Sequence, residues 1–578
     1  MLLQRLVEYQ NRWESQHPEQ VIPPEYKLQS IDWIIDLDQE GKPLGPPVSA
    51  AGDDSSRRFE IKAPYIKRSG RGIPPQLLCD KAEFILGVAG DNGKRAQDRF
   101  RKHYDLLLTS AQLIETEDLN PIRKFYDSGI EELSIDEIEP DEFITFRVDN
   151  AFIVEKASVQ ELWASLAPII LDNKPKDFDK ESIGNLLESS SDVTETTCLI
   201  CGNTSVPQRI DPVQIKMPAY LTSNQTALVS ANENAFESYG LEQSYTAPKC
   251  KSCTVKYAQG LNNLLQDEQT SLHLNKAVYI FWSQNEQAVS DILNFLKEPK
   301  PEDVKIYIKS IFADKDSSST IDSEAFYVAG FTASGGRAVV RDWFETTLDA
   351  VKDSIAHFLR NQYLSGDKYH GIFSLAASTV RDVNNDLPPQ TLPILIGAAL
   401  KAEPLPWWLV TSALRRSRAE TSKGMQMTAP RASLIKLVFA TNKHPLFKEG
   451  NMEELNTSVE SPAYHCGRLL SVLEEIQEAA IPGVKSTIVD RFFGTASTAP
   501  ASVFGRLVKG SQSHLGKLRK EKPGYHVNLQ RKLADVMGAI HEFPRTLSLE
   551  DQGLFALGYY HQRADRYAKH EAEPASAE

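Results

Sequence analysis

Four of the six cysteines stand in two closely spaced pairs, an arrangement typical of metal ligands. Cys198 and Cys201 form one Cys-x-x-Cys pair, and Cys250 and Cys253 form the other. The two-residue gap allows both sulfurs of a pair to point into one tetrahedral site, and four thiolates suit a structural zinc ion with no position left for water. The alternative is four unliganded or oxidised cysteines, because the 48 residues between the pairs exceed the about 15 to 20 of a compact zinc ribbon.

Other chemical signatures are incomplete. The sequence has no His-Glu-x-x-His motif, and residues 510–518 only resemble a phosphate-binding P-loop, with Leu518 where a magnesium-binding Ser or Thr belongs. The acidic run 136–142 can in principle hold a divalent cation, although such runs are usually solvated. The sequence therefore favours a protein that is not an enzyme, with a metal-dependent nuclease acting on DNA as the alternative.

Positive charge gathers in two blocks of a chain whose formal net charge is -14. Residues 57–71 carry six Lys or Arg against Glu60, and residues 491–535 carry nine against two acidic residues. Residues 127–149 hold nine acidic residues against one arginine. Two basic blocks on an acidic background indicate local grooves for a polyanion such as nucleic acid. The alternative is that these charges belong to solvated helix faces.

The segment 67–77 lies partly within the first basic block and has the composition of a nucleic-acid-binding loop. Its cations can meet phosphates, its glycines allow the backbone to approach DNA closely, and its glutamine can hydrogen-bond a base edge. The candidate contact residues are Lys67, Arg68, Arg71, Gly72 and Gln76. Basic turns rich in Gly and Pro are common, so the pattern needs independent support.

The residue periodicity predicts an α+β fold, in which a mixed α/β N-terminal portion with the four-cysteine zinc site precedes a mainly helical C-terminal bundle. Strands are expected at residues 31–37, 143–148, 278–282, 304–308, 325–331 and 338–340. Gly335 and Gly336 predict a tight hairpin turn between the last two strands. Polar connections are expected at residues 42–56, 172–197 and 313–320.

Helical periodicity dominates after residue 350. Leu469, Leu473 and Ile476 fall on one helical face, and Ser548 with Asp551 predicts a capped helix start. The expected domains are residues 1–345, with a cysteine-knuckle subdomain at 190–260, a helical middle region at 346–451, a C-terminal helical domain at 452–569 and a disordered tail at 570–578. The first nine residues predict an amphipathic helix, and no stretch is apolar enough to span a membrane, so we expect a cytoplasmic protein.

Unbroken strings distributed over most of the chain resemble one protein family. They are residues 73–87, 198–202, 235–240, 387–389, 413–418, 490–500 and 543–563, and the last two are the most specific. Together they resemble the large subunit of the subtype I-C, or Dvulg-type, CRISPR Cascade surveillance complex. The resemblance implies a subunit without enzymatic activity that recognises the PAM of double-stranded target DNA, assists duplex opening and R-loop formation, and recruits a helicase-nuclease.

The resemblance also implies partners and further contact residues. The partners are a crRNA-containing Cascade, with its backbone subunit, crRNA-processing subunit and small subunit, the target DNA and the helicase-nuclease. Family members commonly carry Asn where Gln76 stands, and they tend to be richer in Gly and Ser over residues 217–232. Further candidate nucleic-acid contacts are Ser223, Asn224, Gln225, Arg415, Arg416, Arg506, Lys509 and Lys517.

The same resemblance suggests that the C-terminal part is also made separately as the small subunit. Met452 follows residues 448–451, whose codons can spell a purine-rich ribosome-binding stretch, and a start there leaves 127 residues. That product contains the second basic block, which suits phosphate contacts along a single strand. The alternative is an ordinary internal methionine.

Overall fold

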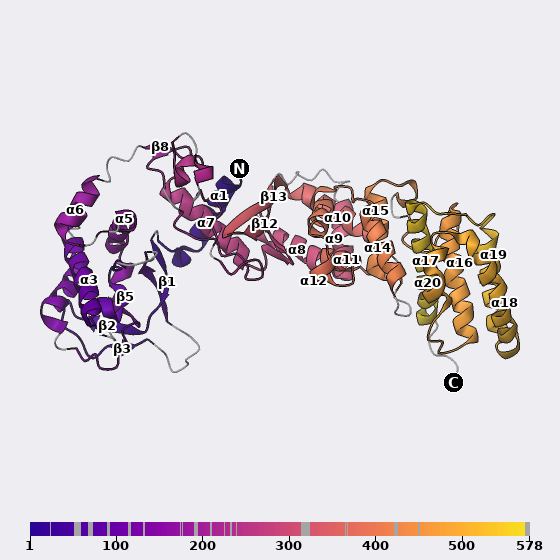
Figure 1. The fold of residues 1–578 in the computed structure, drawn as a ribbon, viewed down its shortest axis with the longest axis horizontal. Coiled ribbons are helices and arrows are strands. Elements are labelled where there is room, and N and C mark those ends of the chain that lie inside the picture. Colours follow the sequence, from indigo (N-terminus) through magenta and orange to yellow (C-terminus); the bar gives the residue numbers. More distant parts are fainter. Residues whose placement is uncertain are drawn as a thin grey trace. The chain divides into compact units, whose positions relative to one another are not determined.

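The computed structural model divides the chain into two compact units (Figure 1). Unit 1 comprises Met1–Ile215 and Ala227–Leu261, and unit 2 comprises Lys216–Thr226 and Asn262–Glu578. The structure describes residues 1–23, 25–50, 59–66, 73–89, 93–113, 117–130, 133–173, 175, 177–189, 195–208, 211–224, 226–231, 234–237, 240–313, 324–364, 366, 368–420, 426–448 and 451–572. No helix in these described ranges is long and apolar enough to cross a bilayer.

A mixed five-stranded sheet lies at the centre of unit 1. Its order is β3-β2-β6-β5, with β7 also paired to β6, and only β2 and β6 run parallel. β1 and β4 form a separate antiparallel pair. The strands are β1 (Tyr26–Ser30), β2 (Trp33–Leu37), β3 (Val48–Ser49), β4 (Glu60–Pro64), β5 (Cys79–Lys81), β6 (Phe143–Val148) and β7 (Ala151–Phe152). The predicted strands at 31–37 and 143–148 are confirmed.

Helices complete the apolar core of unit 1. Leu106 of α3 and Trp163 of α5 are buried in the same cluster as Ile35 of β2 and Phe146 of β6. The helices of this unit are α1 (Leu2–Gln16), α2 (Ala82–Ile85), α3 (Gly93–Leu113), α4 (Asn120–Lys124), α5 (Ala157–Asn173), α6 (Lys180–Ser189) and the part of α7 (Lys251–Gln266) up to Leu261. The predicted amphipathic helix at the N-terminus is confirmed, since Leu2 and Leu6 of α1 are buried.

The polar connection predicted over residues 172–197 is wrong in part, because it contains α6. Asp179 accepts a hydrogen bond from the backbone N–H of Ser182 at 2.8 Å, so this carboxylate satisfies a free donor of the first helical turn. Ile183 is fully buried in the core of unit 1. The polar composition of the segment indicated a surface connection, and the buried side of the helix was therefore not recognised.

Unit 2 begins with a four-stranded antiparallel sheet of order β10-β11-β12-β13. Its strands are β10 (Ser271–Leu274), β11 (Ala277–Trp282), β12 (Ala325–Ser334) and β13 (Arg337–Thr347). Ser334 pairs with Arg337, and Gly335 and Gly336 have φ angles of 54° and 77°, so the predicted two-residue hairpin is confirmed. The strand expected at 278–282 is also present.

The strand predicted at 304–308 is wrong, because these residues lie in α9 (Pro301–Ala313). Proline at the first position and two acidic residues in the first turn favour a helix start. Alternating β-branched residues suggested a strand, yet Ile306 is 69% exposed while Val304 is fully buried. The ring centres of Tyr307 and Phe295 are 4.5 Å apart, so Tyr307 lies on the side of this helix that packs against α8 (Glu286–Lys297).

One apolar core joins this sheet to the helices that follow it. The core extends from Leu272 to Tyr559, so the sheet and the C-terminal bundle belong to one unit and the expected boundaries at residues 345 and 451 do not separate their cores. The helices are α8 (Glu286–Lys297), α9, α10 (Leu348–Gln362), α11 (Ile372–Ala377), α12 (Val383–Asp386), α13 (Thr391–Lys401), α14 (Trp408–Ala419), α15 (Ala429–Thr441), α16 (Pro462–Ala480), α17 (Ile488–Ala496), α18 (Phe504–Glu521), α19 (Pro523–Gly538) and α20 (Leu549–Ala572).

The C-terminal bundle is built around α16, which contacts α17, α18, α19 and α20. Leu469, Leu473 and Ile476 are buried as their spacing predicts. Ser548 and Asp551 form the predicted capping arrangement, because the backbone N–H of each donates to the side chain of the other. α20 continues to Ala572, so the tail predicted at 570–578 is wrong for its first three residues. Residues 573–578, 51–56 and 314–320 of the predicted tail and loops lie outside the described residues.

Candidate metal centre and nucleic-acid interface

The structure brings the two cysteine pairs together in unit 1. The sulfurs of Cys198, Cys201, Cys250 and Cys253 all lie within 4.8 Å of one another. The sulfurs of Cys201 and Cys250 are 3.9 Å apart. Zinc–sulfur bonds of about 2.3 Å in a tetrahedron place sulfurs about 3.8 Å apart, so the donor set fits a zinc ion. The other two cysteines, Cys79 and Cys466, are buried elsewhere.

A short hairpin and a helix start position the four ligands. Cys198 and Cys201 lie in the turn between β8 (Thr196–Thr197) and β9 (Thr204–Ser205), where Gly202 adopts a φ of 77°. That left-handed conformation closes the turn and is accessible to glycine at little cost. The second pair flanks the start of α7, at Cys250 and Cys253.

Backbone contacts close the long gap between the pairs. The N–H of Leu199 donates to the carbonyl of Pro248 at 3.0 Å, and the N–H of Gln208 donates to that of Lys249 at 2.7 Å. These bonds lay the segment before α7 against the hairpin that carries the first pair. The 48-residue gap in the sequence is therefore not an obstacle to one shared centre.

Hydrogen bonds from the backbone favour a thiolate at Cys198. Burial acts to raise the pKa of this thiol, but N–H groups that include those of Cys250 and Ile200, at 3.3 and 3.4 Å from the sulfur, bring the pKa down to about 6. Burial raises the pKa of Cys253, and the neighbouring thiols add to that effect. Four thiols this close cannot all ionise cheaply without a cation, and a divalent metal supplies that charge.

A buried ion pair supports the second cysteine pair, and sequence reasoning missed it. Lys249, next to Cys250, is 1% exposed, and its ammonium lies 3.3 Å from a carboxylate oxygen of Asp211. The hydroxyl of Tyr257 in α7 donates to the same carboxylate. Burial raises the pKa of Asp211, while Lys249 and Tyr257 oppose that rise. The Lys directly before Cys250 gave no sequence signal because its partner Asp211 lies far away along the chain.

The structure places Gln76 inside unit 1 and not on its surface. Its side chain is 3% exposed, its carbonyl oxygen accepts from the N–H of Ile66 at 3.2 Å, and its amide nitrogen donates to the carbonyl of Cys79 at 3.4 Å. Its own backbone N–H donates to Asp80 at 2.8 Å. Lys67, Arg68, Arg71 and Gly72 lie outside the described residues. Gln76 thus ties the two ends of this basic segment together.

The candidate nucleic-acid contacts at residues 223–225 belong to unit 2, although they lie within the sequence range of the predicted cysteine-knuckle subdomain. Ser223 and Asn224 are exposed, and Gln225 lies outside the described residues. The segment is held by the hydroxyl of Tyr220, which donates to the carbonyl of Ala277 at 3.0 Å. These polar candidates are therefore attached to the β10–β11 hairpin.

The candidate arginines of α14 differ in availability. Arg415 is exposed, whereas Arg416 donates to the carboxylate of Glu420 at 2.7 Å and has a side chain only 17% exposed. Glu420 also lies 3.8 Å from Arg431. Arg416 is therefore engaged in an intramolecular ion pair in this structure.

A row of cations occupies the exposed face of α18. Arg506 and Lys509 are exposed, and the side chain of Lys517 is 48% exposed while its ammonium caps the carbonyl of Ala480 at 2.8 Å. The guanidinium of Arg506 lies 4.8 Å from the ring centre of Phe492. The opposite face carries the buried residues, which are Phe504, Leu507, Ser511, Leu515 and Leu518. The cations extend about 17 Å along the helix at 1.5 Å per residue.

The acidic run 136–142 does not form a comparable centre. Within the described residues, the four cysteines are the one group of three or more ligand-type side chains close enough to share a metal. Glu142 accepts hydrogen bonds from the indole of Trp33 at 2.7 Å and the N–H of Glu139 at 2.8 Å, so this carboxylate fixes local structure. The nuclease alternative gains no support from this arrangement.

The fold and the centre define a two-unit protein, mixed α/β and ending in a helical bundle, with four cysteines gathered as for a metal ion. Its residues 6–567 match the family described as CRISPR-associated protein (Cas_Csd1), so the chain belongs to the CRISPR-associated Csd1 family. No curated protein matches the chain. Membership of the family supports a CRISPR-associated subunit of the Cascade type.

Proposed function

We propose that the chain is the large subunit of a subtype I-C Cascade complex. In this role it recognises the PAM of double-stranded target DNA, assists opening of the duplex and recruits the helicase-nuclease, without an enzymatic activity of its own. The observation that carries the proposal is the family match over residues 6–567. Its partners are the backbone subunit, the crRNA-processing subunit and the small subunit of a cytoplasmic crRNA complex.

The basic segment 67–72 is our candidate for the PAM-proximal contacts. The described residues on either side of it are joined by the hydrogen bond from the N–H of Ile66 to the side chain of Gln76. Lys67, Arg68 and Arg71 supply charge for phosphates, and Gly72 lets the backbone approach the groove. Because the Gln76 amide is already bonded to the backbone, we assign Gln76 the positioning of this segment.

The exposed cations of α18 are our candidate for contacts to a single strand or to the guide-bound target strand. A row of Arg506, Lys509 and Lys517 follows one helix face, which suits contacts with successive phosphates. Ser223, Asn224, Gln225, Arg415 and Arg416 remain candidates for further contacts. Of these, Arg416 must first leave Glu420. The bundle that carries α18 lies wholly within the product that a start at Met452 would give, and we propose that this product is the small subunit.

The experiment compares the assembled complex on duplexes that differ only in the PAM. We expect tighter binding to the PAM-bearing duplex, and we expect the triple variant Lys67→Ala, Arg68→Ala, Arg71→Ala to bind both duplexes more weakly. Losing three phosphate contacts should also lower the slope of log affinity against log salt by about 3. The control variant Lys300→Ala, Lys305→Ala, Lys309→Ala removes three exposed cations elsewhere.

Two results would overturn the proposal. One is equal affinity of the wild-type complex for duplexes with and without any PAM candidate. The other is cleavage of the DNA by the purified chain with Mg²⁺ or Mn²⁺, which would restore the nuclease alternative.

A further inference from the structure

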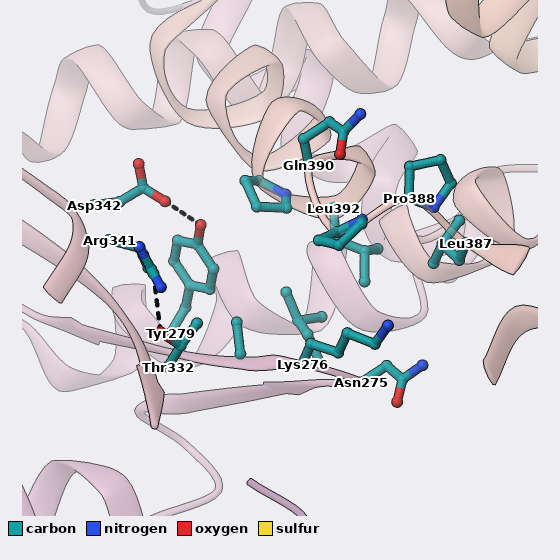
Figure 2. Close-up of a pocket in the computed structure, with 14 residues that line it drawn as sticks. Asn275, Lys276, Tyr279, Thr332, Arg341, Asp342, Leu387, Pro388, Gln390 and Leu392 are labelled. Carbon is teal, nitrogen blue, oxygen red and sulfur yellow. Dashed lines mark hydrogen bonds between the residues drawn. The ribbon is translucent and has the colours of Figure 1, made fainter. Parts of the chain in front are cut away.

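Unit 2 contains a pocket of about 390 Å³ between its sheet and the segment that leads into α13 (Figure 2). Tyr279, which lines the pocket, is 1% exposed, and its hydroxyl donates to the carboxylate of Asp342. Arg341 at the rim donates to the hydroxyl of Thr332 at 2.9 Å. These four polar side chains thus bond one another. A more exposed group of charges lies where α14, α17 and the start of α20 meet.

Arg418, in the last turn of α14, extends to the end of α17 and to α20. Its Nε donates to the hydroxyl of Ser497 at 3.3 Å, and its Nη2 donates to the side-chain carbonyl of Gln552 at 2.6 Å. Gly494 of α17 lies beside its stem, since a Cβ atom there would be 3.9 Å from Cγ of Arg418. Both hydrogen-bond partners are neutral oxygens, so they fix the guanidinium without cancelling its charge.

The charge of Arg418 has no carboxylate partner in the part of the chain that the structure describes. Burial lowers the pKa of its guanidinium, and no acidic side chain of that part opposes the shift. Burial also lowers the pKa of Arg431 in α15, but there Glu420 opposes it. Arg418 is nevertheless exposed at the surface. Because charges that are partly withdrawn from water are normally paired, Arg418 is suited to an anion from outside the chain.

Three more exposed arginines lie around this position. Arg415 is one turn earlier on α14, and Arg491 is one turn before Gly494 on the same face of α17. Arg545 lies just beyond the end of α17, in a loop whose backbone is hydrogen-bonded to residues 498 and 501. Among the described residues, none of these three arginines bonds a carboxylate. We call them, together with Arg418, the arginine surface.

Acidic residues on the same elements are mostly engaged by the protein itself. Asp490 accepts a hydrogen bond from a side-chain amide and another from a backbone N–H, both at 2.6 Å. Asp551 caps the start of α20, and Glu420 pairs with an arginine of α14 at 2.7 Å. Glu542 and Glu550 are exposed, so two open carboxylates stand against four arginines. The arginine surface is therefore locally positive in a chain of net charge -14.

The chemistry of the arginine surface suits phosphates. A guanidinium is planar, remains charged and can donate two N–H groups to the oxygens of one phosphate. Arg418 keeps Nη1 for this purpose, because its two internal hydrogen bonds use Nε and Nη2. Arg506, whose guanidinium lies over the ring of Phe492 next to Arg491, continues the positive charge toward the row of cations on α18. A continuous row of cations fits a chain of phosphates better than a single anion.

We propose that the arginine surface binds the phosphates of a single DNA strand that continues along α18. Arg418 makes the central contact, because its position is already fixed by α17 and α20. The inference rests on the proposed function, since opening of a duplex releases single strands that must be held apart. Phosphate contacts carry no sequence information, so this surface holds the strand and does not read it.

The test measures binding of the purified full-length chain to a short oligothymidine by fluorescence anisotropy at several salt concentrations. Each phosphate contact with a single strand contributes about 0.7 to the slope of log affinity against log salt. We expect Arg418→Gln to lower this slope by about 0.7, whereas Arg418→Lys, which keeps the charge, should retain it. The triple variant Arg415→Gln, Arg491→Gln, Arg545→Gln should lower the slope by about 2.

The control variant Lys300→Gln, Lys305→Gln, Lys309→Gln removes three exposed cations at and before α9 and should keep the wild-type slope. A triple arginine variant that is folded by thermal melting and keeps the wild-type slope overturns the proposal, as does an equal loss in the control. Dependence on these arginines for oligouridine but not for oligothymidine overturns the assignment to DNA. Failure to assemble with the partner subunits, at an unchanged slope, assigns the surface to a protein interface instead.

The preference of the assembled complex for a PAM-bearing duplex is a separate measurement. It should be unchanged in the triple arginine variant, because the arginine surface contacts phosphates of any sequence. A wild-type complex without PAM preference would contradict the proposed function while the slopes still support the arginine surface. Unchanged slopes in a complex with PAM preference would overturn the arginine surface alone.

Discussion

The side-chain carbonyl of Gln76 accepts a hydrogen bond from the backbone N–H of Ile66 at 3.2 Å, and this bond closes the ends of the basic segment between them. The same amide donates to Cys79, which precedes the buried Asp80. Gln76, which the composition of segment 67–77 suggested as a residue that contacts a base, is thus part of the interior of unit 1. A substitution of Gln76 therefore removes hydrogen bonds of the interior.

Gln76→Ala is expected to weaken DNA binding without changing its salt dependence. The variant leaves the buried N–H of Ile66 without an acceptor, which costs about 1 to 3 kcal/mol of stability, and it removes the hydrogen bond between the residues on either side of the basic segment. The cations remain, so the slope of log affinity against log salt should stay constant while affinity falls for PAM-bearing and PAM-less duplexes alike. Filter binding at several salt concentrations measures both quantities.

Gln287→Ala, which removes an exposed glutamine from α8, is the control and should bind DNA normally. A selective loss of PAM preference in Gln76→Ala, with unchanged stability, would instead mean that this amide reads a base.

Zinc should accompany the native protein at about one equivalent, because four cysteine sulfurs surround one position. Cys253→Ser should lose the metal and lower the melting temperature of unit 1, since a structural zinc contributes to folding. Cys466→Ala removes a buried thiol outside the cluster and should retain the metal. Mass spectrometry of the native protein decides the matter, and less than about half an equivalent would contradict the zinc assignment.

Glycines at the crossing of α16 and α20 are expected to be irreplaceable. A Cβ atom at Gly467 would lie 1.9 Å from the carbonyl oxygen of Phe555, and one at Gly558 would lie 2.1 Å from that of Tyr464. Either Gly→Ala change must push the two helices apart, at a cost of about 1 to 3 kcal/mol or more. The measurement is the shift of the unfolding midpoint in urea.

Gly510→Ala should change the stability of the same bundle in the opposite direction. Gly510 lies in α18 with no atom near its absent Cβ, so alanine should stabilise the helix by about 0.5 to 1 kcal/mol. Equal effects at positions 467 and 510 would show that α16 and α20 do not pack as closely as described.

The sequence allowed prediction wherever a signal was local. Cysteine spacing, the glycine turn at 335–336 and the cap at Ser548 are read within a few residues, and the structure contains all three arrangements. Contacts between residues that lie far apart in the sequence could not be predicted. The gap between the cysteine pairs is closed by backbone hydrogen bonds from Leu199 to Pro248 and from Gln208 to Lys249, and the buried side chain of Gln76 is bonded by the backbone of Ile66.

The errors have related causes. Alternating β-branched residues at 304–308 imitated a strand because packing against Phe295, not alternation, decides the fold of α9. The pocket of unit 2 gave no sequence signal either, because its walls come from three separate segments of the chain, at residues 274–279, 332–342 and 387–393.

Acidification from pH 7 to pH 5 is expected to destabilise unit 2 through His561. This histidine is 1% exposed, its Nδ1 bonds the hydroxyl of Tyr464 at 2.9 Å, and burial with the nearby Lys436 lowers its pKa to about 3. In the unfolded chain a histidine has a pKa of about 6.5, so the unfolded state takes up a proton as the pH falls below that value. Stability is therefore present above pH 6.5 and is lost toward pH 3, by about 2 kcal/mol between pH 7 and pH 5.

The variant His561→Gln should be less stable at pH 7 but should show a flatter dependence on pH. His541→Gln, which changes an exposed histidine of the same bundle, should keep the wild-type dependence. Urea titrations at pH 5, 6 and 7 would measure the slopes, and an unchanged slope in His561→Gln would contradict the buried neutral state.

Expression of the intact gene should yield, besides the full chain, a polypeptide of 127 residues that begins at Met452. Every helix of the bundle follows this residue, from α16 to α20. In the full chain, Gly553 of α20 packs against the ring of Phe439 in α15, so the short product exposes this face. We therefore expect it to co-purify with the complex and not to remain as a free monomer, because an apolar helix face left uncovered favours association.

A leucine codon that cannot initiate translation, placed at Met452, should abolish the short polypeptide and leave the full chain folded. Met452 is 3% exposed in the core, and Met→Leu usually costs less than about 1.5 kcal/mol. Met427→Leu makes the same exchange at another methionine that is 3% exposed and should leave the short product in place. Gel electrophoresis with N-terminal sequencing identifies the band. Only a start at Met452 makes the short polypeptide depend on that codon, so a short polypeptide that persists unchanged in Met452→Leu would rule out this start.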